Sequence, residues 1–352
     1  MRIDGFDHAT GAHCGSTSLR DLSDCYGWGL SEPACFGLGS GLGFVYLDLP
    51  MSPWHMLIGR PLWLETAFFE TLAVPHTERR GDDWERAWDD VKDHLAAGDP
   101  VMVFVDLYYL DYYDTDTHFA PHSLLVVGYD EDADATEAPH ADPDAGTGVA
   151  YMADSEFEEV QPLPLSSLRA AWSATDMLPL DNRYIVAEGD PRADVGAAVR
   201  EAIVETARYM LDPADATRDT LGDRMNMGTH GLPGIHAFAE SMADWPAVED
   251  PSWTARFAYQ NVERRGTGGG AFRGLYAPFL DELGTEAGLP DRFAEEMHGI
   301  AGDWSSLAAV LYEASERDPD DMAPLLDEAA ERVHAVADRE ETFYGDVLAA
   351  LE

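Results

Sequence analysis

The sequence predicts an α+β domain, an antiparallel sheet packed against helices, followed by an all-helical domain. Two observations support this fold class. In the first half, short apolar runs typical of strands, such as PVMVFVDLYY (100–109) and HSLLVVGYD (122–130), alternate with helical patterns. After GDPRADVG (189–196), nearly every segment repeats its apolar residues at helical spacing. We therefore place the boundary near residue 190, which divides the chain into domains 1–189 and 190–352.

Two helices are expected in the first domain. Residues 16–28 begin with Ser16 and Thr17, residue types that cap helices. Residues 82–100 form an amphipathic helix that ends at Gly98 and Pro100, because four apolar side chains recur at helical spacing: Trp84, Trp88, Val91 and Leu95. A helix followed by a run of strands is typical of an antiparallel sheet covered by helices. The strands are expected at 100–109, 122–130, 148–155 and 182–189, after a glycine-rich and then strand-like stretch at 36–48.

The second domain shows no convincing strand pattern. Its helices are expected at about 193–211, 231–243, 253–264, 271–287, 290–299, 302–316 and 320–350. The glycine run GTGGG (266–270) interrupts them and is most simply a tight turn between helices. Glycine-rich turns at helix starts can also hold an anion on their free amides, which would place a phosphopantetheine or a carboxylate near Arg273.

The chain is strongly acidic throughout. There are 67 Asp and Glu residues against 22 Lys and Arg, which gives a formal net charge of −45, and Lys92 is the single lysine. Because nucleic acids and anionic membranes are also negative, neither is expected as a partner. Acid spread over the whole chain with almost no lysine is typical of proteins from cells that accumulate salt. We therefore expect the fold to need high salt, which screens the repulsion.

Targeting and cysteine patterns also limit the function. The N-terminal MRIDGFDHATG has neither the basic start nor the apolar core of an export signal, so a cytoplasmic location is expected. No apolar run approaches the roughly 20 residues that cross a bilayer. Cys14, Cys25 and Cys35 have no CxxC or zinc-binding spacing, so neither a disulfide framework nor a zinc site is expected. No cofactor is indicated.

Cys14 is the first candidate for chemistry. It lies in HATGAHCGSTSLRDL, directly before a predicted helix. The positive end of a helix dipole and the free amides there lower the pKa of a thiol and favour the nucleophilic thiolate. Gly15 would let a substrate approach the backbone. The alternative is a small buried cysteine without a chemical role.

His122 and Asp154 are the candidates for a base and its orienting partner. His122 starts the apolar strand SLLVVGYD, and Asp154 lies near the end of the next predicted strand, AYMADS. If these strands pair as neighbours, the Asp154 carboxylate can reach the far ring nitrogen of His122. Cysteine, then histidine at a strand start, then aspartate at the following strand end is the papain-like order. Taken singly, His122 could be a core histidine and Asp154 a turn residue.

Several motifs, in order, resemble the butirosin-biosynthesis acyltransferase family, BtrH. The N-terminal similarity is carried by HATGAHCGSTSLRDL, LSEPACFGLGSGLGFVYL, PVMVFVDLYYLDYY, HFAPHSLLVVGYD and YMADS. The helical half is similar to the domain of unknown function that commonly follows, in GLPGIHAFAESMADW (231–245) and RRGTGGGAFRGLYAPFLDEL (264–283).

This resemblance implies a papain-like fold and transfer of an acyl group from a carrier-protein thioester to an amine of an aminoglycoside. It implies Cys14 as the nucleophile that accepts the acyl group, His122 as general base and acid, and Asp154 as the orienting residue. It does not imply the same substrate.

His8 and His13 are the candidates for stabilising an oxyanion. Papain-like peptidases with double-glycine leader specificity often have glutamine six residues before the cysteine, where this chain has His8. A ring N–H of His8 would donate there, and His13 competes for the same role, with the backbone amide of Cys14 as a further donor. The alternative for both is a loop histidine.

Four residues near the expected site are candidates for binding substrate: Asp106, Tyr109, Tyr112 and His118. Asp106 would attract a cationic amine to an aromatic wall, although a polar strand end on an acidic surface has the same composition. Arg273 beside the glycine run is a further candidate. His118 and His122 stand four apart, but Pro121 argues against the helix that such a zinc pair needs, so no metal is expected.

These observations favour a cysteine-dependent acyltransferase. Cys14 would take an acyl group from a thioester of an acyl carrier protein or coenzyme A and pass it to a small-molecule amine. A peptidase or amidohydrolase of the same fold would use the same residues with a different acceptor, water. A non-catalytic binding protein that keeps the fold is the third interpretation, and an unreactive Cys14 would indicate it. The oligomeric state stays open.

Overall fold

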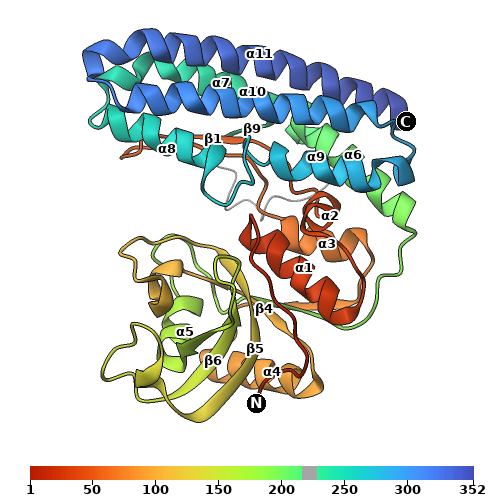
Figure 1. Cartoon of the computed structure of the whole chain (residues 1–352), viewed down its shortest axis with the longest axis vertical. Coiled ribbons are helices and arrows are strands. Elements are labelled where there is room, and N and C mark those ends of the chain that lie inside the picture. Colours follow the sequence, from red (N-terminus) through yellow and green to blue (C-terminus); the bar gives the residue numbers. More distant parts are fainter. Residues whose placement is uncertain (216–227) are drawn as a thin grey trace. The chain divides into compact units, whose positions relative to one another are not determined.

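The computed structural model describes residues 1–215 and 228–352, which form two compact units. The first unit contains Met1–Glu32 and Ala73–Arg192, and the second contains Pro33–Leu72 and Ala193–Glu352 (Figure 1). The expected α+β region followed by a helical region is confirmed. Our contiguous division near residue 190 differs from these units, because residues 33–72 belong to the second one.

A six-stranded antiparallel sheet forms the centre of the first unit, in the order β3-β8-β4-β5-β6-β7. Its strands are β3 His76–Arg79, β4 Val101–Val105, β5 His122–Asp134, β6 Thr147–Ala153, β7 Gln161–Pro164 and β8 Tyr184–Ala187. The strand expected at 100–109 ends early, because the Asp106 side chain accepts the Tyr108 N–H and caps a 3-10 turn. Three short 3-10 turns complete the unit: η1 Leu107–Tyr109, η2 Asp111–Tyr113 and η3 Ala135–Glu137.

Three helices pack on this sheet. α4 (Trp84–Ala97) and α5 (Leu165–Trp172) share one apolar core with alternate residues of β4, and α1 (Cys14–Tyr26) contacts β5. α4 begins where Asp83 accepts the Arg86 N–H and ends at Gly98, whose φ of 95° favours glycine. Burying each large apolar side chain of this core stabilises the fold by about 1.5–3 kcal/mol. The sheet is thus a firm support for residues at its strand ends.

The second unit is mainly helical. Apart from Glu32, the first residue of α2, it contains the helices α2 Glu32–Leu38, α3 Leu64–Thr71, α6 Val195–Leu211, α7 Gly231–Ser241, α8 Pro251–Glu263, α9 Arg273–Leu283, α10 Arg292–Ser315 and α11 Pro319–Leu351. Short 3-10 turns lie at η4 Pro213–Asp215, η6 Met242–Ala247 and η7 Gly284–Ala287. The two helices expected at 290–299 and 302–316 form the single helix α10.

A small sheet joins the two sequence segments of this second unit. Its order is β2-β1-β9, with β1 Val45–Asp48, β2 His55–Ile58 and β9 Thr229–His230. Pairing of β1 with β9 places residues 33–72 with the later helices. The expectation of no strand beyond residue 190 is wrong at β9, because a strand of two residues has no alternation that a pattern could reveal.

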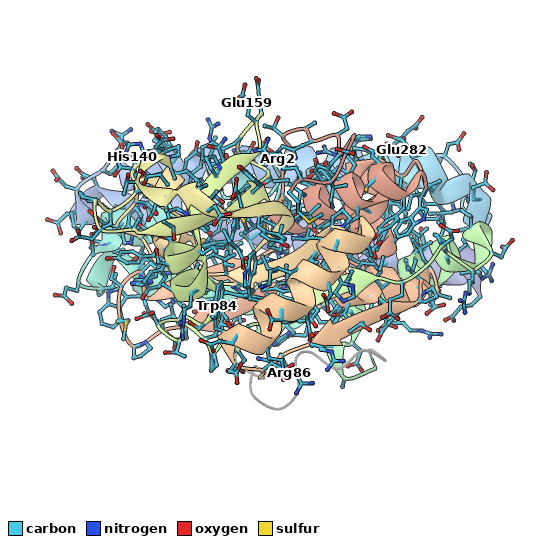
Figure 2. The ribbon with its side chains drawn as sticks, turned by 90° about the horizontal axis from the view of Figure 1, so that it is seen from below. Arg2, Trp84, Arg86, His140, Glu159 and Glu282 are labelled. Atoms are coloured by element: carbon cyan, nitrogen blue, oxygen red, sulfur yellow. The ribbon has the colours of Figure 1, made fainter. Side chains whose placement is uncertain are left out.

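Acidic side chains largely face solvent. Glu159 and Glu282 are exposed and point away from the ribbon (Figure 2). At such positions water and salt screen their mutual repulsion. Among the described residues, no helix combines the length and the apolar character that a membrane span needs.

Candidate active site

Cys14 is the first residue of α1 and is only 8 % exposed. His13 caps this helix, because its backbone is extended and its ring Nδ1 accepts the Ser16 N–H at 3.3 Å. The Ser123 hydroxyl, from the start of β5, donates to Cys14 Sγ at 3.5 Å. The thiol therefore lies at the positive end of a helix dipole, which favours its ionised form.

His122 and Asp154 lie at adjacent ends of two paired strands. β5 and β6 are antiparallel neighbours, with Leu125 opposite Ala153, so the start of β5 meets the end of β6. His122 Nε2 lies 3.0 Å from Asp154 Oδ2, and both residues are buried. Because Nε2 faces the carboxylate, Nδ1 is left for the hydrogen bond that His122 makes with Cys14. The structure thus brings the three residues together in one buried cluster.

The charges of this cluster reinforce one another. Burial by itself would raise the pKa of the Cys14 thiol, but the neighbouring rings of His13 and His122, with their hydrogen bonds to the thiol, lower it well below its ordinary value. Burial disfavours a charged His122 ring, yet the Asp154 carboxylate raises the pKa of His122 well above its ordinary value. For Asp154 too, burial is outweighed: the charge of His122 and three hydrogen bonds lower its pKa. These directions favour a thiolate beside an imidazolium.

Tyr112 and Tyr113 supply two of the hydrogen bonds to Asp154. The Tyr112 hydroxyl donates to Oδ2 and the Tyr113 hydroxyl to Oδ1, each at 3.0 Å. Tyr112 was predicted to bind substrate, but it is 6 % exposed and its hydroxyl is turned to the carboxylate. Its role in the structure is to hold Asp154.

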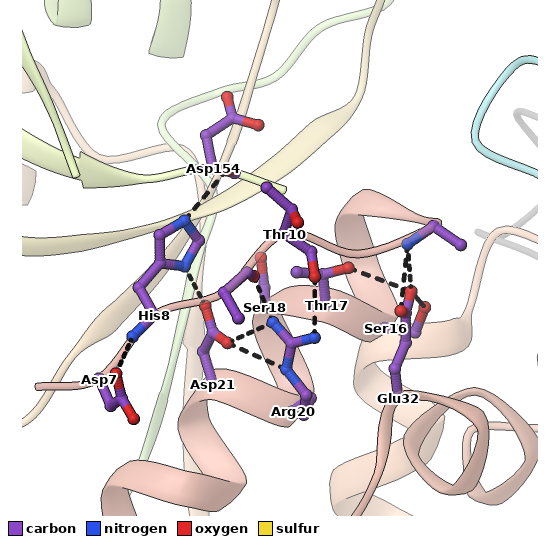
Figure 3. A network of polar contacts seen from close by, with 12 residues as sticks. Asp7, His8, Thr10, Ser16, Thr17, Ser18, Arg20, Asp21, Glu32 and Asp154 are labelled. Carbon is purple, nitrogen blue, oxygen red and sulfur yellow. Dashed lines mark hydrogen bonds and ion pairs between the residues drawn. The ribbon is translucent and has the colours of Figure 1, made fainter. Parts of the chain in front are cut away.

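Both ring nitrogens of His8 are engaged (Figure 3). Nδ1 lies 2.5 Å from Asp21 Oδ2, and Nε2 lies 2.9 Å from the Phe157 carbonyl oxygen and 3.2 Å from that of Asp154. Burial disfavours a charged ring, but the Asp21 carboxylate and the carbonyls raise the pKa of His8. The oxyanion role predicted for His8 therefore has no N–H left to serve it. Instead, His8 ties the N-terminal segment to α1 and to the turn after Asp154.

Glu32 fastens the loop that leads into Cys14 (Figure 3). Its carboxylate accepts the backbone N–H of Ala12 at 3.0 Å and of His13 at 2.9 Å, and the hydroxyl of Thr17 at 3.1 Å. Gly11 permits this arrangement, since an added Cβ would lie 1.9 Å from Thr17 Oγ1 and 2.8 Å from Glu32 Oε2. Gly11 and Glu32 together fix the course of the backbone through His13.

The described part of the chain contains one group of three potential metal ligands. It consists of Asp106, His118 and Asp176, whose ligand atoms lie within 4.8 Å of one another. Each already has a protein partner. Asp106 accepts two backbone N–H groups at 3.1 Å and lies 2.7 Å from His118 Nδ1, while the Tyr109 hydroxyl donates to Asp176 at 3.1 Å. These bonds fasten the 107–119 loop to the end of β4, and they account for the group without a metal.

An acidic pocket of about 400 Å³ lies at the η1–η2 loop. Its lining includes Tyr109 and three carboxylates, Asp111, Asp114 and Asp116. Tyr109 is thus one of the residues that line this pocket. Asp106 and His118 are not part of this lining, and Asp106 is completely buried, so its carboxylate does not face an acceptor there.

Arg273 belongs to the interior of the second unit. Its completely buried guanidinium donates to both carboxylate oxygens of Glu340, at 2.9 and 2.7 Å, and to two backbone carbonyl oxygens. This corrects the expectation that Arg273 binds substrate, because its charge is balanced inside the core. The glycine run before it forms a tight turn, in which the Gly270 N–H donates to the Glu263 carboxylate at 3.2 Å.

Sequence patterns do not identify three residues that shape the site: Asp21, Glu32 and Ser123. Tyr113, by contrast, directly follows Tyr112 in YYLDYY and belongs to the aromatic wall expected beside the site. Asp21 and Glu32 are two acids among 67 Asp and Glu residues, so composition does not distinguish them from surface acids. Their roles depend on contacts with the loop before Cys14.

Comparison with known families agrees with the motifs. The family described as butirosin biosynthesis protein H, N-terminal, matches residues 13–136, and the domain of unknown function DUF4872 matches residues 166–347, more than half of the chain. No curated protein matches. The first match contains Cys14 and His122, whereas Asp154 lies between the two matches. The match boundaries coincide neither with our division near residue 190 nor with the compact units.

Proposed function

We propose, from the premise that this chain belongs to the butirosin biosynthesis protein H N-terminal family with its following DUF4872 domain, that it is a cysteine-dependent acyltransferase. The observation that carries the proposal is the buried cluster of Cys14, His122 and Asp154. A thiol with a lowered pKa beside a charged imidazole is a nucleophile ready to attack a carbonyl carbon.

The reaction divides into two steps at Cys14. In the first, the thiolate attacks the carbonyl carbon of a thioester, and the tetrahedral intermediate expels the donor thiolate, which takes the proton of His122. In the second, an amine attacks the acyl-enzyme while the now neutral His122 accepts its proton. The amide is released and the thiolate–imidazolium pair is restored. Asp154 orients the imidazole and stabilises its charge throughout.

His13 is our proposed oxyanion donor. Because its Nδ1 accepts the Ser16 N–H, the proton of a neutral ring is on Nε2. Nε2 lies 3.9 Å from Cys14 Sγ, beside the atom to which the attacked carbon would bond. The backbone N–H of Cys14, at the first position of α1, would be the second donor.

The proposed acceptor is a cationic amine, and the acidic pocket at the η1–η2 loop supports this choice. Its three carboxylates attract positive charge, and the same loop carries the tyrosines that hold Asp154. The proposed donor is a thioester of an acyl carrier protein or coenzyme A. Its phosphate charge is repelled by a chain of net charge −45, so its binding should tighten as salt rises.

The test is acyl transfer by the full chain in molar salt, with acyl-coenzyme A thioesters as donors and a polyamine as acceptor. Intact-mass and peptide analysis should find one acyl group on Cys14, which the amine removes as an amide. Cys14→Ala should give neither adduct nor amide and keep its circular dichroism spectrum, whereas Cys25→Ala should behave as wild type. A fully active Cys14→Ala protein contradicts the proposal. Discharge to water alone, with amines present, would favour the hydrolase.

A further inference from the structure

The Asp154 carboxylate is enclosed by protein donors on both of its oxygens. Tyr113 donates to Oδ1 at 3.0 Å, and Tyr112 shares Oδ2 with His122, each at 3.0 Å. The Asp154 residue is completely buried. Simple orientation of an imidazole requires a single acceptor oxygen, so two further charge-assisted hydrogen bonds call for another explanation.

We propose that Tyr112 and Tyr113 are positioning residues that set the basicity of Asp154 and thereby the pH range in which the reactive thiolate exists. The proposal rests on the proposed function of Cys14 as a nucleophile and adds a control on its ionisation. The hydroxyls of both tyrosines donate to the carboxylate, and both residues act through it.

The physical reason lies in how the carboxylate shares its charge. A hydroxyl that donates to a carboxylate stabilises the ionised form and makes it a weaker base. With two such donors, Asp154 stays ionised although it is buried, and its negative charge stabilises the protonated His122 ring less strongly. Without one of them, the more basic Asp154 would stabilise the imidazolium more strongly, and the imidazolium would in turn stabilise the Cys14 thiolate more.

The packing around the two tyrosines fits this role. Phe157 lies edge-on to both rings, at 5.1 Å from each, and its backbone N–H closes a turn onto the Asp154 carbonyl at 3.0 Å. The Tyr113 ring also stands perpendicular to the His122 ring at 5.9 Å. The Phe157 ring thus packs against both tyrosines and keeps their hydroxyls on the Asp154 carboxylate. The backbone of Phe157 belongs to the same turn as Asp154.

Other ionisable groups around this carboxylate must be considered in any pH experiment. Those that interact with Asp154 or with its two tyrosines are Cys14 on α1, His122 on β5, Asp111 on η2, Glu156 in the turn, and His8, which contacts the Asp154 backbone. Asp111 and Glu156 are not changed in the variants below, so their contribution is common to all proteins compared.

The experiment measures the rate of Cys14 alkylation by iodoacetamide against pH, in molar salt, for wild type, Tyr112→Phe, Tyr113→Phe and Tyr184→Phe. Tyr184→Phe is the matched control, because the Tyr184 hydroxyl donates to Asp90 at 3.0 Å in the same unit and away from the cluster. Unfolding in urea measures the stability of each variant. Since the assay needs no substrate, it is independent of the identity of the acyl donor and acceptor.

We expect the profiles of Tyr112→Phe and Tyr113→Phe to move to lower pH by roughly half to one unit, the scale of a lost charge-assisted hydrogen bond. Tyr184→Phe should lose stability and keep the wild-type profile. If the profile of Tyr113→Phe coincides with that of Tyr184→Phe, this proposal is overturned, while the proposed function is unaffected. A wild-type Cys14 with an ordinary thiol profile would overturn both. Should Tyr112→Phe fail to fold, Tyr113→Phe decides alone.

Discussion

Replacing Asp154 by asparagine isolates the charge of the cluster from its shape. Asparagine has nearly the same size, and its amide oxygen can accept from Tyr112 and His122 at the position of Oδ2. Its amide group can donate to the Tyr113 hydroxyl, which then acts as acceptor. The fold and the orientation of the imidazole should therefore be kept, while the negative charge that stabilises a protonated His122 is lost.

The expected magnitude follows from the bond that changes. A hydrogen bond to a charged group contributes about 1.5–3 kcal/mol and a neutral one about 0.5–1.5 kcal/mol, so the pair loses about 1–1.5 kcal/mol. This corresponds to a shift of the Cys14 alkylation profile by about one pH unit to higher pH, and to a roughly tenfold slower alkylation on its acidic side. Peptide mass spectrometry would measure the rate against pH, with Cys25 as the internal control. A rate for Asp154→Asn that stays within about twofold of wild type on the acidic side of the profile would refute this reasoning.

The stability difference between wild type and Asp154→Asn should also depend on pH. Folding lowers the pKa of Asp154, so its contribution is complete above the unfolded value of about 3.9 and is lost as pH falls through the lower folded value. Folding raises the pKa of His122, so its contribution is complete below about 6.5 and is lost as pH rises through the folded value. The wild-type advantage in urea unfolding should therefore be greatest between about pH 4 and 6.5. A difference that does not vary with pH would contradict it.

Three further predictions concern the rest of the chain. Lowering the salt concentration should lower Tm strongly, because a net charge of −45 is then unscreened, and a Tm independent of salt would contradict this. Gly11→Ala should slow Cys14 alkylation, since its Cβ would lie 1.9 Å from Thr17 Oγ1. Gly302→Ala, in α10 with nothing within 4 Å of its Cβ, should not; equal rates would count against the loop argument. Arg273→Met should lower the free energy of unfolding in urea by about 3–5 kcal/mol, because it leaves the Glu340 carboxylate buried without its ion-pair partner. Adding Glu340→Leu to the same chain should restore most of this stability, and a double variant whose losses simply add would speak against this explanation.

Sequence reasoning succeeds where local pattern determines structure. The helix from Trp84 carries its own apolar stripe and its own end signals, so its bounds are found within a few residues. His122 and Asp154 could be paired in advance because consecutive strands usually lie side by side, and the register of β5 with β6 confirms that pairing. Cys14 could be placed because the helix that follows it is local.

Contacts between distant residues set the limit. His8 was expected at the oxyanion because of its spacing from Cys14, but its ring nitrogens bind Asp21 and the carbonyls after β6, which no spacing reveals. Tyr112 and Tyr109 look alike in sequence, yet one hydroxyl faces Asp154 and the other Asp176. The placement of residues 33–72 in the second unit depends on β1 pairing with β9, and β9 is too short to carry a pattern.

The most direct test of the central claim is the rate of Cys14 alkylation against pH in molar salt, with Cys25 and Cys35 measured in the same digest. Burial and the charge of Asp99 raise the pKa of the Cys25 thiol, and Cys35 is completely buried, so both should react slowly. We expect Cys14 to react fast, with an apparent pKa well below the ordinary value of about 8.5. A Cys14 that reacts no faster than Cys25 across the pH range would contradict the account and favour a binding protein that keeps the fold.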